Sequence, residues 1–222
     1  RGHAEHAYLL HATFVTQHLL DLRGREILAA DADDLLQPRD VDELARIVDP
    51  PEIARALGKK DLITVKALQL SVSNGLESQH NSWDGSYFHT ARIASRKAYE
   101  EAGITDPRNQ VSMMEVHDCF SVTELVTMED LGLSEPGRAI FDILDGVYDR
   151  DGAVPCQIDG GLKCFGHPVG ASGLRMAYEV YNQLLGRAGE RQRDTVNFGL
   201  THNLGGAPFN SVAAVSILGR MN

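Results

Sequence analysis

The sequence contains no apolar run that approaches the ~20 residues needed to cross a bilayer as a helix. It also shows no stretch with the pattern of a secretory signal peptide. Cysteine is scarce, because Cys119, Cys156 and Cys164 are the only three, and they form no C-x-x-C pair. These absences disfavour a membrane span, a disulfide framework and a metal site, and they lead us to expect a reducing, cytoplasmic location.

Basic residues are also in short supply. The chain of 222 residues has 21 Lys and Arg against 31 Asp and Glu, a net charge of -10 and a pI near 5.3. Nonspecific nucleic-acid binding depends on dense positive charge, so no nucleic-acid partner is expected. A phosphate-bearing ligand can still be held by a local Lys or Arg, or by backbone N–H groups.

Glycine, by contrast, is concentrated around one histidine. The run Gly160–Gly173 reads Gly-Gly-Leu-Lys-Cys-Phe-Gly-His-Pro-Val-Gly-Ala-Ser-Gly, with His167 between Gly166 and Pro168. Glycine lets a ligand approach the main chain closely. Apolar residues at helical spacing then predict a helix over residues 174–185, so His167 is expected just before a helix N-terminus, where N–H groups favour negative charge. Taken alone, a solvated histidine in a turn is the commoner outcome.

Two further polar stretches each offer a histidine. Residues 113–120 read Met-Met-Glu-Val-His-Asp-Cys-Phe, a short apolar run that ends at His117. Residues 197–208 read Asn-Phe-Gly-Leu-Thr-His-Asn-Leu-Gly-Gly-Ala-Pro and contain His202. Glycine-bounded turns with histidines are typical of sites that position chemistry.

The periodicity of apolar residues predicts alternating strands and helices from residue 61 onward. Because a helix connects the first two strands, we expect a right-handed crossover onto a largely parallel sheet. The last two strands are expected to be antiparallel across a turn at 202–210. The predicted strands cover residues 61–72, 112–116, 195–200 and 211–218, the predicted helices 89–102, 120–131 and 174–185, and a loop-rich excursion 137–161.

Residues 1–60 carry little information. Apolar residues at helical spacing predict a helical N-terminal segment of unclear role, separate from a domain over 61–222. Four histidines invite a metal site, but no acid or cysteine partners them closely, so surface histidines are the preferred interpretation. They are His3, His6, His11 and His18.

Three motifs in order carry a family resemblance. They are His-Asp-Cys-Phe at 117–120, Gly-His-Pro at 166–168 and His-Asn-Leu-Gly-Gly at 202–206. The sequence resembles the C-terminal half of a thiolase over residues 62–219, most closely the sterol-carrier-protein type and its bacterial acetyl-CoA acetyltransferase-like relatives. Biosynthetic thiolases usually carry Asn-Glu-Ala-Phe and Cys-x-Gly in the first and third positions. The resemblance implies an α/β fold with a mixed five-stranded sheet flanked by helices, one half of an αβαβα arrangement.

The resemblance also implies roles for individual residues. A coenzyme A thioester would be the substrate, with no permanently bound cofactor, and oxyanion holes would stabilise enolate and tetrahedral charge. His167 would activate a nucleophile and bind an oxyanion, His117 would belong to an oxyanion hole, and Cys119 would be the acid/base cysteine. The remaining implied site residues are Gly166 beside His167, and His202, Asn203, Gly205 and Gly206 in a third active-site turn. We therefore predict that His117, Cys119, His167 and His202 converge on one pocket.

Structural roles are the alternative for several of these side chains. Cys119 can be an inert buried thiol, and His202 a hydrogen-bonded turn residue. Cys164 is expected to pack, and Cys156 to be structural or at the surface. Glu115 and Asp118 are expected to be structural, while Lys163 and Arg175 are candidates to meet a phosphate.

One departure from the family pattern bears on mechanism. The nucleophilic cysteine of a thiolase lies in its N-terminal half, and no cysteine precedes Cys119 here. Three hypotheses follow: an acyl-CoA thiolase of lipid or steroid metabolism whose nucleophile lies elsewhere, a thiolase-like retro-aldolase of steroid side-chain degradation, or a non-catalytic subunit that completes another chain. The resemblance implies a homodimer or hetero-oligomer, and for the aldolase an OB-fold zinc-ribbon partner.

Overall fold

The computed structural model describes residues 58, 62–74, 84–207 and 209–220. The predicted helical segment 1–60 lies outside the described residues except for Gly58. No helix within the described ranges is long and apolar enough to cross a membrane.

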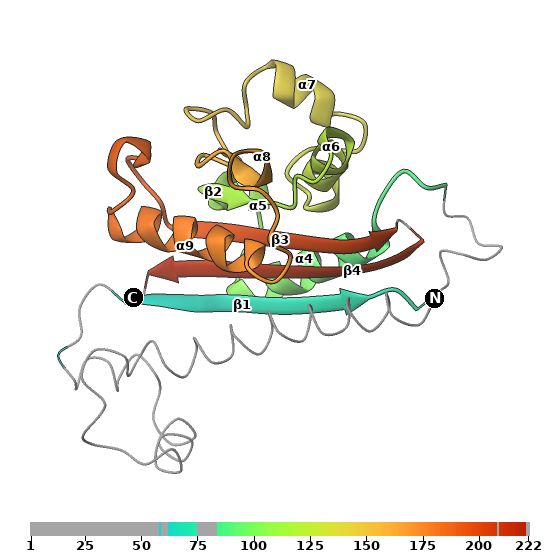
Figure 1. Ribbon diagram of the computed structural model, residues 1–222, viewed down its shortest axis with the longest axis horizontal. Helices are drawn as coiled ribbons and strands as arrows, with labels where there is room; N and C mark the ends of the chain where they lie inside the picture. Colours follow the sequence, from blue (N-terminus) through green and yellow to red (C-terminus); the bar gives the residue numbers. More distant parts are fainter. Residues whose placement is uncertain (1–57, 59–61, 75–83, 208, 221–222) are drawn as a thin grey trace, which may run out of the picture.

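A mixed sheet forms the centre of the domain (Figure 1). Its strand order is β1-β4-β3-β2, with β1 at Ile63–Val72, β4 at Asn210–Arg220, β3 at Phe198–Ala207 and β2 at Met113–Glu115. The pairs β1–β4 and β4–β3 are antiparallel, and only β3–β2 is parallel. The prediction of a largely parallel sheet is therefore wrong, because the β3–β4 hairpin is inserted between β1 and β2.

The described part of the sheet has four strands, not the predicted five. Where a further strand would lie, the chain makes a single parallel bridge between Met114 and Cys156. The amide of Met114 donates to Pro155, and the amide of Gln157 donates back to Met114. Pro155 has no N–H to extend a ladder, and the following backbone enters a left-handed conformation at Gln157 (φ 55°).

Helix α4, at His89–Ala102, covers one face of the sheet and confirms the predicted helix. It ends at Gly103, whose left-handed conformation (φ 69°) suits glycine. Small side chains on its inner face allow close packing against β1 and β4, and this forms the larger core. Its members include Ala67, Ala91, Ala94, Ala98, Ala213, Val215 and Ile217.

Helix α9, at Ser172–Leu185, lies on the opposite face, in front of the sheet in Figure 1. A Cβ atom on Gly199 of β3 would lie 2.2 Å from Cγ1 of Val180, so glycine at this position permits the close packing of α9. The helix ends at Gly186, again with positive φ. A second, smaller core forms here from Ile63, Met113, Val180, Leu184, Val196 and Leu218.

Shorter helices lie on the β2 side of the sheet, where Figure 1 shows α6, α7 and α8 grouped together. The predicted helix 120–131 is confirmed as α6, at Ser121–Asp130. Two helices that the sequence analysis did not predict are α7 at Ala139–Leu144, within the expected excursion, and α8 at Gly161–Phe165. The remaining elements are α5 at Pro107–Gln110 and the 3-10 helix η3 at Gly189–Arg191.

The predicted antiparallel arrangement of the last two strands is confirmed, but the predicted turn at 202–210 is wrong. His202 pairs with Val215 and Gly206 with Ser211, so both lie within the ladder. Strand β3 continues to Ala207, which pairs with Asn210. Polar and small residues that look like a turn are held in the strand by hydrogen bonds to β4.

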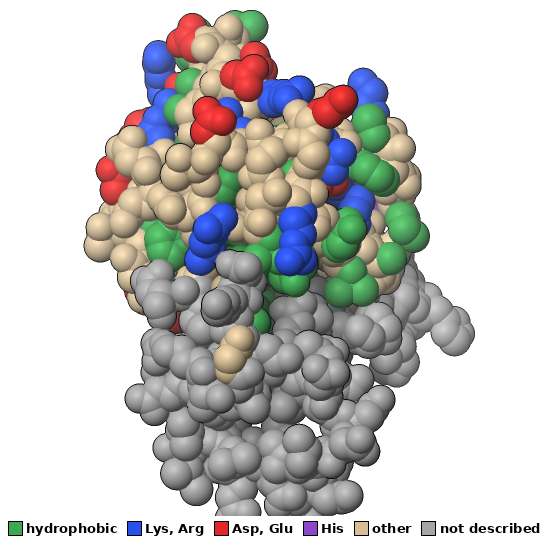
Figure 2. All heavy atoms as spheres, turned by 90° about the vertical axis from the view of Figure 1, so that its left-hand side faces the viewer, with side chains coloured by type: hydrophobic (Ala, Val, Ile, Leu, Met, Phe, Trp, Pro, Cys, Tyr) green, Lys and Arg blue, Asp and Glu red, His purple; other side chains and the backbone are tan. Residues whose placement is uncertain are grey.

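Figure 2 shows a face on which acidic and basic side chains are interspersed over the coloured part. This face carries no continuous basic surface of the kind that binds a nucleic-acid backbone.

Candidate functional site

The three motif stretches meet at one cavity of about 570 Å³. His117 and Cys119 reach it from the segment after β2, and His167 reaches it from the segment between α8 and α9. Strand β3 contributes predicted site residues as well, namely Asn203, Gly205 and Gly206. Segments that are far apart in sequence thus place two imidazoles, a thiol and an amide around one space.

The two cavity histidines are in contact with each other. The ring centroids of His117 and His167 are 4.9 Å apart in an edge-to-face arrangement. His117 is buried, whereas His167 is exposed. Cys119 is also exposed, so the alternative of an inert buried thiol does not describe it. Imidazole N–H groups and a thiol at one cavity wall are suited to hydrogen-bond a carbonyl oxygen and to move a proton.

His167 is tied to the start of α9. Its Nδ1 lies 2.8 Å from Oγ of Ser172, the first residue of the helix. The segment between them is a compact turn, in which the backbone N–H groups of Ala171 and Ser172 both donate to the carbonyl of Pro168. The predicted place of His167, just before a helix N-terminus, is confirmed.

His202 does not join the other histidines in lining the cavity, so this part of the predicted convergence is wrong. Side chains alternate along a strand, and His202 shares its face of β3 with Leu200 and Leu204, which belong to the larger core. The ring is fully buried, and neither nitrogen has a hydrogen-bond partner. Burial first, and then the nearby His117, lowers the pKa of His202 to about 3. His202 is therefore a neutral core residue beneath the site.

Gly166 is the other predicted site residue that does not line the cavity. It ends α8 with a positive φ of 74°, a conformation that few residues other than glycine adopt. Gly173, unlike Gly166, packs directly against a residue that lines the cavity. A Cβ atom there would lie 3.2 Å from Nδ2 of Asn203, so glycine lets the first turn of α9 pack against the cavity amide.

Most of the remaining cavity wall is apolar, and the sequence analysis did not identify it. The signal was weak, because apolar side chains in or beside strands and helices would ordinarily be assigned to the core. They are Leu70, Phe88, Phe120, Val122, Val126, Val169, Leu204, Val212 and Ala214. Several of them, including Leu70, Phe120 and Val169, are exposed in the described structure. The cavity thus combines a small polar cluster with an apolar wall.

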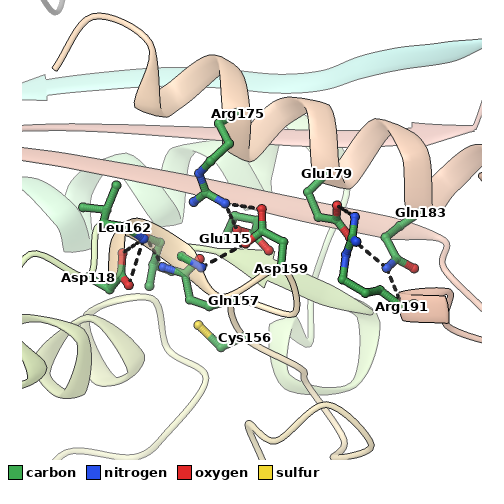
Figure 3. A network of polar contacts seen from close by, with 12 residues as sticks. Glu115, Asp118, Cys156, Gln157, Asp159, Leu162, Arg175, Glu179, Gln183 and Arg191 are labelled. Atoms are coloured by element: carbon green, nitrogen blue, oxygen red, sulfur yellow. Dashed lines mark hydrogen bonds and ion pairs between the residues drawn. The ribbon is translucent and has the colours of Figure 1, made fainter. Parts of the chain in front are cut away.

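A buried ionic network lies beside the start of α8 (Figure 3). The guanidinium of Arg175 lies 3.2 Å from Glu115 and also pairs with Asp159. Burial raises the pKa of Glu115 well above its usual range, and the neighbouring Asp159 raises it further, while Arg175 opposes the shift. Both contacts use Nη1 of Arg175, and this candidate for a phosphate contact does not line the cavity.

The same network fixes the first turn of α8. Asp159 accepts a hydrogen bond from the amide of Gly161, and Asp118 accepts one from the amide of Leu162 at 3.0 Å. The expected structural roles of Glu115 and Asp118 fit this arrangement. Because α8 leads directly into the His167 segment, these bonds help to fix that segment relative to β2.

The other two cysteines lie away from the cavity lining. Cys164 is exposed on α8, so the expectation that it packs is wrong. Cys156 is half-buried, and its Sγ lies 3.6 Å from a carboxylate oxygen of Glu124. Burial and the neighbouring carboxylates, Glu124 first among them, raise the pKa of Cys156 well above its usual range. Within the described ranges no group of His, Cys, Asp or Glu is placed to hold a metal ion.

Comparison with known proteins gives these motifs a family. Residues 73–220 match the family described as Thiolase C-terminal domain-like. The chain belongs to the thiolase C-terminal domain family. This thiolase domain is 36% identical over 176 residues to an acetyl-CoA acetyltransferase of Methanothermobacter thermautotrophicus, a match that covers 79% of this chain and 44% of the archaeal protein. It is 41% identical over 118 residues to human sterol carrier protein 2, covering 53% of this chain and 21% of the human protein.

The predicted resemblance is confirmed by these relatives, and the thiolase domain spans less than half of their length. A solved structure described as Ltp2-ChsH2(DUF35) aldolase matches with a TM-score of 0.61 at 16% identity, covering 98% of this chain and 63% of that chain. At that identity the likeness supports the fold. The mixed sheet flanked by helices is therefore thiolase-like.

Proposed function

We propose that this thiolase domain acts on an acyl-CoA thioester by stabilising the negative charge of an enolate at its carbonyl oxygen. The observation that carries the proposal is the placement of His117, Cys119 and His167 on one cavity, beside an apolar wall. The thioester oxygen would accept hydrogen bonds from the imidazoles, and the thiol of Cys119 would exchange a proton with the α-carbon. Donors fixed in such a site each contribute about 3 to 4 kcal/mol to transition-state stabilisation.

In the thiolase form of this chemistry, an enolate and an acyl group are joined or separated. The acyl group is carried on a cysteine, which attacks the thioester carbonyl and expels coenzyme A thiolate. Cys119 is the only cysteine that lines the cavity of the described residues, and it is assigned to proton transfer. The nucleophile would therefore come from a further segment or from a partner chain. The acetyl-CoA acetyltransferase relative supports this form.

A second form needs no acyl-cysteine, and the aldolase among the structural neighbours favours it. In a retro-aldol cleavage, a base removes the proton of a β-hydroxyl group, and the bond between the α- and β-carbons breaks. The products are a ketone or aldehyde and the enolate of the shortened thioester, which takes up a proton at its α-carbon. The same imidazoles would stabilise that enolate, and the apolar wall would hold the leaving fragment. The partner named with that aldolase makes a hetero-oligomer part of this form of the proposal.

Both forms predict exchange of the α-proton of an acyl-CoA with solvent. The full-length protein is incubated with propionyl-CoA in D₂O, and deuterium at the α-carbon is followed by mass spectrometry. Exchange faster than in buffer is expected, with a loss of 100-fold or more, on the order of one missing catalytic group, in Cys119→Ala. Cys164→Ala is the matched control, because that thiol is also exposed but does not line the cavity. Exchange that survives unchanged in Cys119→Ala would refute the assigned role.

Intact mass then separates the two forms. A stable mass increase on a cysteine after incubation with an acyl-CoA supports the thiolase form. Release of a carbonyl product from a β-hydroxyacyl-CoA without any adduct supports the retro-aldolase form.

A further inference from the structure

Ser172 makes a contact with His167 that neither the motifs nor the cavity lining account for. It is the first residue of α9, its side chain is buried with 2% of the residue exposed, and its Oγ lies 2.8 Å from Nδ1 of His167. Ser172 itself does not line the cavity. A buried hydroxyl thus contacts Nδ1 of an exposed imidazole that lines the cavity, and this contact leaves Nε2 at the other edge of the ring.

The direction of this hydrogen bond follows from what else the hydroxyl can reach. A serine hydroxyl has a single proton, and the only other acceptor near it is the carbonyl of Pro168 at 3.4 Å. That carbonyl already accepts the backbone N–H groups of Ala171 and Ser172, at 2.6 and 3.1 Å. The contact to Nδ1, at 2.8 Å, is shorter than the one to the Pro168 carbonyl. The hydroxyl of Ser172 is therefore better placed to donate to Nδ1 than to the carbonyl of Pro168.

We propose that Ser172 is a positioning residue that holds neutral His167 in the tautomer with its proton on Nε2. A neutral imidazole carries one N–H, so a ring that accepts at Nδ1 must donate from Nε2. His167 then presents an N–H donor to the cavity. This inference rests on the proposed function for its chemical meaning: His167 binds the oxygen of the enolate, and proton transfer at the α-carbon falls to Cys119.

The surroundings of Ser172 are rigid enough for such a role. Gly173 brings the first turn of α9 against Asn203, where any side chain would meet the amide. Arg175, three residues after Ser172 on α9, is held by Glu115 and Asp159. Hydrogen bonds that fix an imidazole in one orientation are effective only when the partner itself cannot move.

The first test is the tautomer, measured by ¹⁵N NMR of the ring nitrogens of His167 in the full-length protein without substrate. The signals are assigned by their loss in His167→Gln. In the neutral form, a protonated Nε2 and an unprotonated Nδ1 that accepts a hydrogen bond are expected. In Ser172→Ala the Nδ1 signal should move to the position of a nitrogen without a donor, and Ser172→Thr should restore it because the hydroxyl is kept. A proton on Nδ1 in the native protein, or ring signals unchanged by Ser172→Ala, would overturn the proposal.

The second test is the α-proton exchange of propionyl-CoA. Ser172→Ala should lower the maximal rate by about 10- to 100-fold with little change in KM, because the donor is misplaced while the rest of the site is intact. Ser172→Thr should recover most of that rate. A Ser172→Ala protein as active as the native one would contradict a positioning role. If no variant shows exchange but the NMR signals behave as expected, the tautomer is correct and the proposed function fails.

Discussion

The buried imidazole of His202 makes the stability of this fold depend on pH in a way that can be calculated. Its pKa in the folded protein is about 3, against 6.5 for an ordinary histidine. Between these values the unfolded chain takes up a proton that the folded protein excludes. Stability from this residue is therefore complete above pH 6.5 and is lost progressively as the pH falls. One pKa unit corresponds to about 1.36 kcal/mol, so lowering the pH from 7 to 5 should cost about 2 kcal/mol.

The assay is urea unfolding of the native protein and of His202→Leu at pH 7 and pH 5. Leucine fills a comparable volume and cannot bind the proton, so the variant should lose about 2 kcal/mol less than the native protein between the two pH values. Subtracting the change in unfolding free energy between pH 7 and pH 5 of the variant from that of the native protein cancels the contributions of the other titrating groups. His89→Gln, on the exposed side of α4, is the matched control and should keep the native pH dependence. An equal pH dependence in His202→Leu and the native protein would refute the argument.

Three other predictions follow from packing and burial. Gly199→Ala should destabilise the fold by about 1 to 3 kcal/mol, because its methyl group would overlap Val180, and the double variant with Val180→Ala should recover part of the loss in urea unfolding. Arg175→Met should cost about 3 to 5 kcal/mol at pH 7, since it leaves the buried acidic pair of Glu115 and Asp159 without its cation, and thermal unfolding measures this. Cys156 should resist a thiol reagent such as Ellman's reagent in the folded protein and react after unfolding, whereas the two exposed cysteines react at once; rapid modification of all three thiols in the folded protein would contradict its burial.

The helices that frame the site were predictable because their signals are local. Helices α4 and α9 have apolar residues at helical spacing and a glycine directly after the last turn, at Gly103 and Gly186. The ordered motifs also led to the cavity residues His117 and His167, since each lies where a strand or a glycine-rich turn meets a helix. Periodicity and caps act over a few residues, and the sequence displays them directly.

The wrong predictions concern features that depend on pairing between strands far apart in the sequence. His202 lies among polar and glycine residues that favour a turn, yet hydrogen bonds to β4 extend the strand through it. Within the strand its side chain lies on the same face as Leu200 and Leu204, where it is fully buried and does not line the cavity. Among the described residues no fifth strand is present, and beside β2 the chain around Cys156 makes a single bridge.

The alternation along β3 also gives the hairpin between β3 and β4 a chemical consequence. Asn203 faces the cavity and His202 faces the core, although they are neighbours in the chain. A shift of β3 by one residue against β4 would exchange the two, placing an imidazole where the amide now lies and an amide in the apolar interior. The alignment set where Ala207 meets Asn210 thus decides which polar group faces the cavity. A one-residue insertion in this connection should therefore disturb folding and the cavity wall together, because Gly205 and Gly206 of the same hairpin line the cavity.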